Sequence, residues 1–138
     1  MLGLVCFGCD PAKVDGSDNT TNPNTTNIAN VTISNFITID PRALTFKFYN
    51  QAAPSVDGTV EYSTTKIAAG DIKTFKVPAG SYRLGFIDET GSKTPLMPSL
   101  NAVFNADAWP VKTFAKDSSY SLTLFTDNGN NYWLLQKK

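Results

Sequence analysis

Two cysteines, Cys6 and Cys9, stand near the start of this 138-residue chain with a spacing that suggests covalent chemistry. A redox pair of this spacing needs a following helix, whereas Asp10-Pro11 comes next. A zinc site needs further thiol or imidazole ligands, and the chain holds no histidine and no other cysteine. The third interpretation is the acylated cysteine of a bacterial lipoprotein, because an apolar run and Gly8 precede Cys9, although Cys6 and Phe7 depart from that pattern. We therefore predict Cys9 as a lipidation site, with a disulfide or inter-subunit cross-link through Cys6 and Cys9 as the alternative.

The remaining polar side chains give no catalytic constellation. Without histidine, Ser-His-Asp and Cys-His catalysis and imidazole metal sites are excluded. Most carboxylates stand beside Gly, Ser, Asn or Thr, where turn formation is their usual role, and the stretch 127–131 lacks the closing Glu of a calcium loop. We therefore predict no catalytic residue, metal site or cofactor. The 12 acidic and 12 basic residues cancel, without a basic cluster beyond Lys137-Lys138, which argues against nucleic acid as a partner.

Three aromatic side chains are candidates for ligand contact: Trp109, Tyr132 and Trp133. Such rings can form a platform for sugars, but in a small β-domain aromatic residues more often fill the core. In the run Tyr132-Trp133-Leu134-Leu135 one parity must face outward, so we expect one of Tyr132 and Trp133 to be partly exposed.

The chain divides into three parts. Residues 1–9 form an apolar start that we interpret as a truncated signal peptide or lipobox. Residues 10–27 are rich in Asn, Thr, Asp and Pro and cannot bury enough surface to fold, so we predict a disordered, flexible tether. Residues 28–138 form the predicted domain. The alternative is a cytosolic protein whose apolar start has no targeting role.

From Ile28 onward the apolar residues alternate with polar ones, which is the pattern of half-buried strands. The clearest runs are 31–39, 44–49, 73–77, 82–87, 120–125 and 132–135. Between the last two, Asp127-Asn128-Gly129-Asn130 predicts a tight hairpin. No stretch has helical periodicity, and 93–110, with three prolines, is the expected long connection. We therefore predict an all-β sandwich or small barrel of about seven to nine short strands.

Three motifs stand in order along the domain: FYNQAAPSVD at 48–57, VPAGSY at 77–82, and SYSLTLF at 119–125 followed by DNG at 127–129. Together they resemble the bacterial domain of unknown function numbered 4397, over roughly residues 43–136. The resemblance implies an exported, immunoglobulin-like antiparallel β-sandwich, often carried by lipoproteins or cell-wall proteins, with no established activity. Residues 58–62 replace the family's usual strand, and 95–110 is longer than its norm.

These observations predict an exported protein, anchored in the bacterial cell envelope or extracellular, that touches the membrane only through an N-terminal lipid. Its expected role is non-enzymatic: the sandwich is displayed to bind an envelope protein or glycan, or to serve a structural purpose. One alternative is a fibre subunit in which segment 28–39 adds as a strand to a neighbour's sheet. Its apolar residues are Ile28, Val31, Ile33, Ile37 and Ile39. A second alternative is a carbohydrate-binding module.

Overall fold

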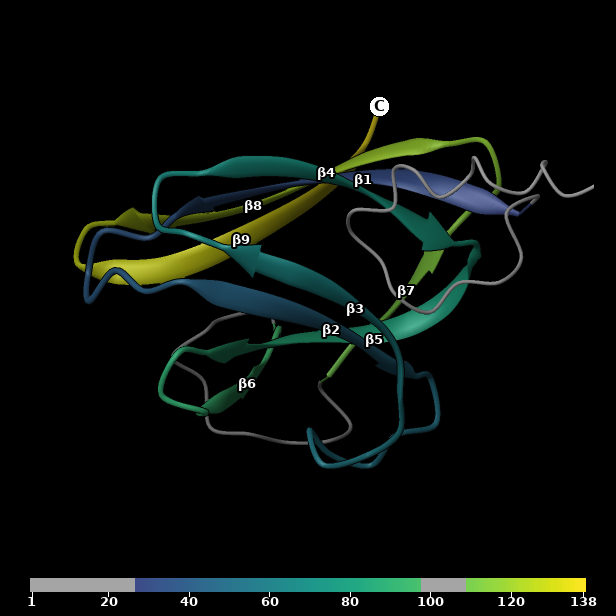
Figure 1. The fold of residues 1–138 in the computed structure, drawn as a ribbon, viewed down its shortest axis with the longest axis horizontal. Coiled ribbons are helices and arrows are strands. Elements are labelled where there is room, and N and C mark those ends of the chain that lie inside the picture. The colour runs from purple at the N-terminus through teal and green to yellow at the C-terminus, as the bar shows by residue number, and fades with distance from the viewer. Residues whose placement is uncertain (1–26, 98–108) are drawn as a thin grey trace, which may run out of the picture.

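Two β-sheets pack face to face in this protein (Figure 1). The computed structural model describes residues 27–97 and 109–138; Cys6, Cys9 and all of the predicted tether except Asn27 lie outside these ranges. Sheet A has the strand order β4-β1-β8-β9, and sheet B has the order β3-β2-β5-β6, with β7 also paired to β5. The strands are β1 (Ile28–Phe36), β2 (Leu44–Asn50), β3 (Val60–Ile67), β4 (Ile72–Pro78), β5 (Gly80–Asp88), β6 (Lys93–Pro95), β7 (Val111–Phe114), β8 (Ser119–Asp127) and β9 (Asn130–Lys137). The predicted all-β sandwich is confirmed.

Alternation along the strands places one set of side chains between the sheets. In β1, Ala29, Val31 and Ile33 are fully buried, while the residues between them face outward. Phe48 of β2 lies at the centre of the core. Its ring meets those of Tyr62, Tyr82 and Phe114 at centroid distances of 5.4, 5.6 and 5.6 Å, all edge-on, which is the favoured packing of aromatic rings.

The hairpin between β8 and β9 forms as predicted. Asn128 and Gly129 have φ values of 48° and 80°, the left-handed conformation that a type I′ turn requires at both central positions. The register then runs without a shift from Asp127↔Asn130 to Tyr120↔Lys137. A local turn therefore fixes the position of the last strand.

Strand β1 lies in the middle of sheet A, antiparallel to β4 and parallel to β8. The parallel pair departs from the predicted antiparallel arrangement. Between β1 and β8 the chain crosses to sheet B and back, and of the intervening strands β4 joins sheet A. This position does not suit the strand-addition role predicted for segment 28–39, since departure of β1 would unpair two strands and expose the core. Most apolar residues of segment 28–39 are not accessible to a neighbour. Ile28 is half-buried, and Val31, Ile33 and Ile37 are buried. Ile39, which follows the end of β1, is exposed.

One buried polar side chain links the two sheets. Asn35 of β1 is 0% exposed, and its Nδ2 donates hydrogen bonds to the carbonyl oxygens of Arg42 (2.8 Å) and Ile67 (3.2 Å). These carbonyls belong to the approach to β2 and to the end of β3. The Oδ1 atom of Asn35 has no hydrogen-bond partner among the described residues. The amide therefore acts as a donor that fixes both sheets at one end of the sandwich.

Candidate binding surface

Trp109 is part of a second apolar cluster, on the outer face of sheet B. Its side chain is 0% exposed, its Nε1 donates to the carbonyl oxygen of Leu84 at 2.7 Å, and its ring meets that of Tyr49 at 5.2 Å. Ala53 and Met97 complete the cluster. The prediction of Trp109 as a ligand contact is therefore wrong: the indole is enclosed and its N–H is bound to the backbone.

Arg83 closes this cluster from the solvent side. Its Nε donates to the carbonyl oxygen of Gln51 at 2.8 Å, and its Nη1 donates to the carbonyl oxygen of Trp109. The guanidinium carbon lies 5.8 Å from the centroid of the Trp109 ring, within the range of a cation–π contact. This part of the outer face of sheet B is thus covered by the protein's own connections.

The two remaining aromatic candidates point to opposite sides of β9. Trp133 faces sheet B, donates from Nε1 to the carbonyl oxygen of Met97, and has the Lys112 ammonium 5.5 Å from its ring centroid. Tyr132 has the opposite parity and lies beside Phe125 of β8, with ring centroids 5.9 Å apart and planes inclined by 31°. Both side chains are half-buried. Of the two, Tyr132 is the residue on the outer face.

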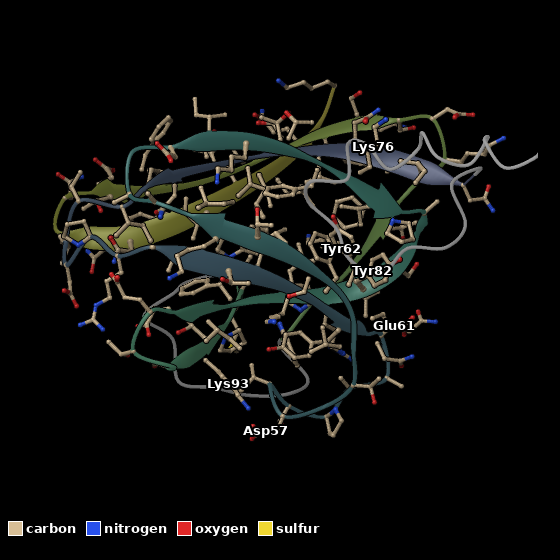
Figure 2. The ribbon with its side chains drawn as sticks, viewed as in Figure 1. Asp57, Glu61, Tyr62, Lys76, Tyr82 and Lys93 are labelled. Carbon is tan, nitrogen blue, oxygen red and sulfur yellow. The ribbon has the colours of Figure 1, made fainter. Side chains whose placement is uncertain are left out.

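The outer face of sheet A has a polar half near the start of β1. Register places Thr32 between Thr74 and Ser121, and the hydroxyls of Thr32 and Thr74 lie 2.8 Å apart. The next row pairs Asn30 with Lys76 of β4. Figure 2 shows Lys76 on the sheet A side of the molecule, whereas Asp57 and Lys93, an ion pair at 2.6 Å, lie on the sheet B side. Hydroxyl and amide groups and the Lys76 ammonium thus lie together on this half.

The other half of the outer face carries large apolar side chains, with Ser34 and Thr123 among them. Phe36 lies opposite Phe125, and Phe125 opposite Tyr132, so three aromatic side chains from adjacent strands form one row. Leu134 follows Tyr132 on the same face of β9 and is 48% exposed; Ile72 of the opposite edge strand is 57% exposed. Sequence reasoning missed Phe36, although its parity opposite to Val31 and Ile33 was the available signal.

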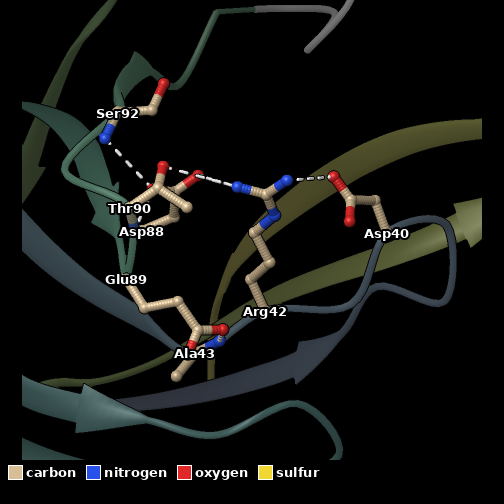
Figure 3. Close-up of polar contacts among 7 residues, drawn as sticks. All are labelled: Asp40, Arg42, Ala43, Asp88, Glu89, Thr90 and Ser92. Atoms are coloured by element: carbon tan, nitrogen blue, oxygen red, sulfur yellow. Dashed lines mark hydrogen bonds and ion pairs between the residues drawn. The ribbon is translucent and has the colours of Figure 1, made fainter.

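A cluster of charges at the β5–β6 turn is structural rather than catalytic (Figure 3). Arg42 contacts Asp40 at 2.7 Å and Asp88 at 3.2 Å, and the hydrogen bond to Asp40 is the main cause of its raised pKa. Asp88 Oδ1 accepts bonds from the hydroxyl and backbone N–H of Thr90 and from the N–H of Ser92. The Thr90 hydroxyl is the main cause of the lowered pKa of Asp88. Asp88 is therefore ionised at neutral pH and acts as a turn clamp, not as a general acid.

Within residues 27–97 and 109–138, no three Asp, Glu, His or Cys side chains gather as a metal site. Comparison of the chain with known protein families, with characterised proteins and with solved structures found no match. The resemblance to the family numbered 4397 therefore stays a prediction, and the candidate site rests on the geometry of sheet A.

Proposed function

We propose that this protein is a non-enzymatic binding module of the bacterial cell envelope, and that it binds a glycan chain on the outer face of sheet A. The row of Phe36, Phe125 and Tyr132 beside the hydroxyl rows carries this proposal. Pyranose rings present apolar C–H faces that pack on aromatic rings, and their hydroxyls exchange hydrogen bonds with Ser, Thr and Asn side chains. A face with both properties side by side suits an extended sugar polymer.

The proposed envelope location rests on the N-terminal sequence. Cys9 would carry the lipid, and the tether of residues 10–27 would give the sandwich reach beyond the membrane surface. Among the residues that the structure describes, no helix is long and apolar enough to span a membrane. Intact mass of the protein from its native cells tests the anchor: we expect a chain that begins at Cys9 and carries acyl mass, and an unacylated chain would contradict it.

Binding of the full-length chain to purified cell-wall polysaccharides and to an array of soluble glycans tests the ligand. We expect the Tyr132→Ala variant to bind about tenfold more weakly, because an aromatic contact is worth roughly 0.5–1.5 kcal/mol beyond the area that it buries. Val60→Ala is the matched control, since Val60 is an apolar residue of β3 with 42% exposure, in the other sheet.

Three results would contradict the proposal. They are the absence of glycan binding by the wild-type protein, equal binding by Tyr132→Ala, and equal loss by Val60→Ala. If the protein captured an envelope protein instead of a glycan, and Tyr132→Ala weakened that binding, the proposed surface would be correct and the proposed ligand class would be wrong. Circular dichroism of both variants checks that each remains folded.

A further inference from the structure

The edge strands of the two sheets differ in how well they are protected from pairing with another strand. Strand β4 contains two lysines and ends at Pro78, the register of β3 with β2 shifts twice, and β6 and β7 have only 3 and 4 residues. Such features protect sheet edges. Strand β9 has less protection: it is an outermost strand of sheet A, has 8 residues, pairs with β8 without a shift, contains no proline, and has its single lysine, Lys137, at its last position.

The hydrogen-bond phase of β9 identifies the backbone groups at its outer edge. Lys138 N donates to Ser119 O at 2.8 Å, which makes this pair a hydrogen-bonded pair of the ladder. Because such pairs alternate in an antiparallel ladder, Gln136, Leu134 and Tyr132 bond to β8. The residues between them direct their N–H and C=O groups away from β8: Asn131, Trp133, Leu135 and Lys137.

We propose that β9 pairs with β9 of a second copy of this chain, antiparallel and around a two-fold axis at Leu134. In this register Trp133 pairs with Leu135 of the second copy, and Asn131 pairs with Lys137. All four outward-directed residues of each strand then form hydrogen-bonded pairs, which no other two-fold register achieves within β9. The strand therefore complements itself over nearly its whole length.

The side chains of β9 favour a second copy as the partner. Apolar residues meet apolar residues at the centre of the interface, with Leu134 against its own copy on the outer face and Trp133 against Leu135 on the inner face. The charged residue within the strand, Lys137, meets the uncharged Asn131, so no like charges lie opposite each other. A two-fold pairing of this kind closes after two copies and does not continue as a fibre.

The joined sheet would have eight strands, because each copy contributes the four strands of sheet A. Since paired residues of adjacent strands lie on the same face, the two outer faces would form one surface of twice the width. The pairing itself does not depend on glycan binding, so the two proposals stand or fall separately.

Sedimentation equilibrium of the full-length chain in reducing buffer tests the pairing without covalent links through Cys6 and Cys9. We expect twice the 15.0 kDa mass of one chain. Leu134→Lys places two ammonium groups opposite each other at the axis and should weaken the dimer by about tenfold or more. Ile72→Lys is the matched control, because it adds the same charge to an exposed apolar site on the same face at the opposite edge. An equimolar mixture of Leu134→Lys and Leu134→Glu should restore pairing.

Hydrogen exchange of the wild-type protein gives a second, variant-free measurement. The amides of Trp133 and Leu135 should exchange slowly in concentrated samples and rapidly in dilute ones, because only the second copy protects them. A monomer at all concentrations, a Leu134→Lys dimer of unchanged affinity, equal weakening by Ile72→Lys, or failure of the mixture to pair would each overturn the proposal. So would protection of these amides that does not depend on concentration, since the chain would then cover its own edge.

Discussion

We expect the Asn35→Asp variant to become less stable, relative to the wild-type protein, as the pH rises from about 4 to about 7. The wild-type amide is fully buried and donates from Nδ2 to the carbonyl oxygens of Arg42 and Ile67. A protonated carboxyl has one O–H group and can satisfy only one of them. An ionised carboxylate satisfies neither and places its charge against two carbonyl oxygens. Ionisation of the introduced carboxyl therefore destabilises the folded state.

The size of the effect follows from these two states. Leaving one buried carbonyl without a donor costs about 1–3 kcal/mol at any pH. Burial beside the carbonyl oxygens also raises the pKa of the introduced carboxyl above its ordinary value of about 3.9. The stability that the variant gains from keeping this carboxyl protonated is fully present below about pH 4. It is lost as the pH rises through the folded-state pKa of the carboxyl. A carboxyl kept protonated up to about pH 7 adds a loss of about 4 kcal/mol, at roughly 1.4 kcal/mol per pH unit. That is a large part of the 5–15 kcal/mol, roughly, that stabilises most domains.

Urea unfolding at about pH 4, 5.5 and 7, followed by tryptophan fluorescence, measures this difference. Asn35→Leu is the matched control: it removes the donor without adding a titratable group, so its loss relative to the wild-type protein should be the same at each pH. A constant difference between Asn35→Asp and the wild-type protein across this range would refute the reasoning. The side chain at position 35 would then reach water rather than fix the two sheets.

Two further substitutions test the packing of sheet B and its turn clamp. A Cβ atom at Gly85 would lie 2.8 Å from the Thr94 carbonyl oxygen and 3.1 Å from Cε2 of Tyr49, so Gly85→Ala should lower the unfolding free energy by about 1–3 kcal/mol in urea; an unchanged midpoint would contradict this close approach. Asp88 has a lowered pKa, chiefly through Thr90, so its stabilisation is present above the ordinary pKa of the carboxyl and is lost as the pH falls through the folded value. The stability difference between wild type and Asp88→Asn should therefore shrink below about pH 4 in thermal melts, and a difference that persists in acid would count against the clamp.

Local patterns in the sequence predict most of the strands but not their neighbours. Alternation identified β2, β4, β5, β8 and β9, because each buries one face in the core, and Asn128-Gly129 identified the last hairpin. Strand β3 was missed because its pattern is broken: Val60 and Glu61 are both exposed, as are Thr65 and Lys66. The parallel pairing of β1 with β8 has no local signal at all, since it depends on how the intervening strands divide between the sheets.

The burial of two polar-capable side chains could not be predicted from the residues around them. Trp109 was expected to contact a ligand and nothing was predicted for Asn35, yet both side chains are fully buried. Each has a polar hydrogen that a distant carbonyl accepts: Ile67 in the first case and Leu84 in the second. Those acceptors lie 32 and 25 residues away in the chain, so the sequence around either residue contains no sign of them.

A central strand and an edge strand differ more in their neighbours than in their sequences. For this reason we propose self-association through β9, although the sequence had suggested the segment that contains β1. Both strands alternate and both contain large apolar residues. Strand β1 has β4 on one side and β8 on the other, so every hydrogen bond that it could give to a second copy is already made within its own sheet. Among residues 27–97 and 109–138, strand β9 pairs with β8 through a tight turn and has no strand on its other side. Alternation places the Leu134 side chain on the outer face, and the strand order places β9 at the edge of sheet A, so a second copy can reach both this side chain and the outward-directed backbone of Trp133 and Leu135.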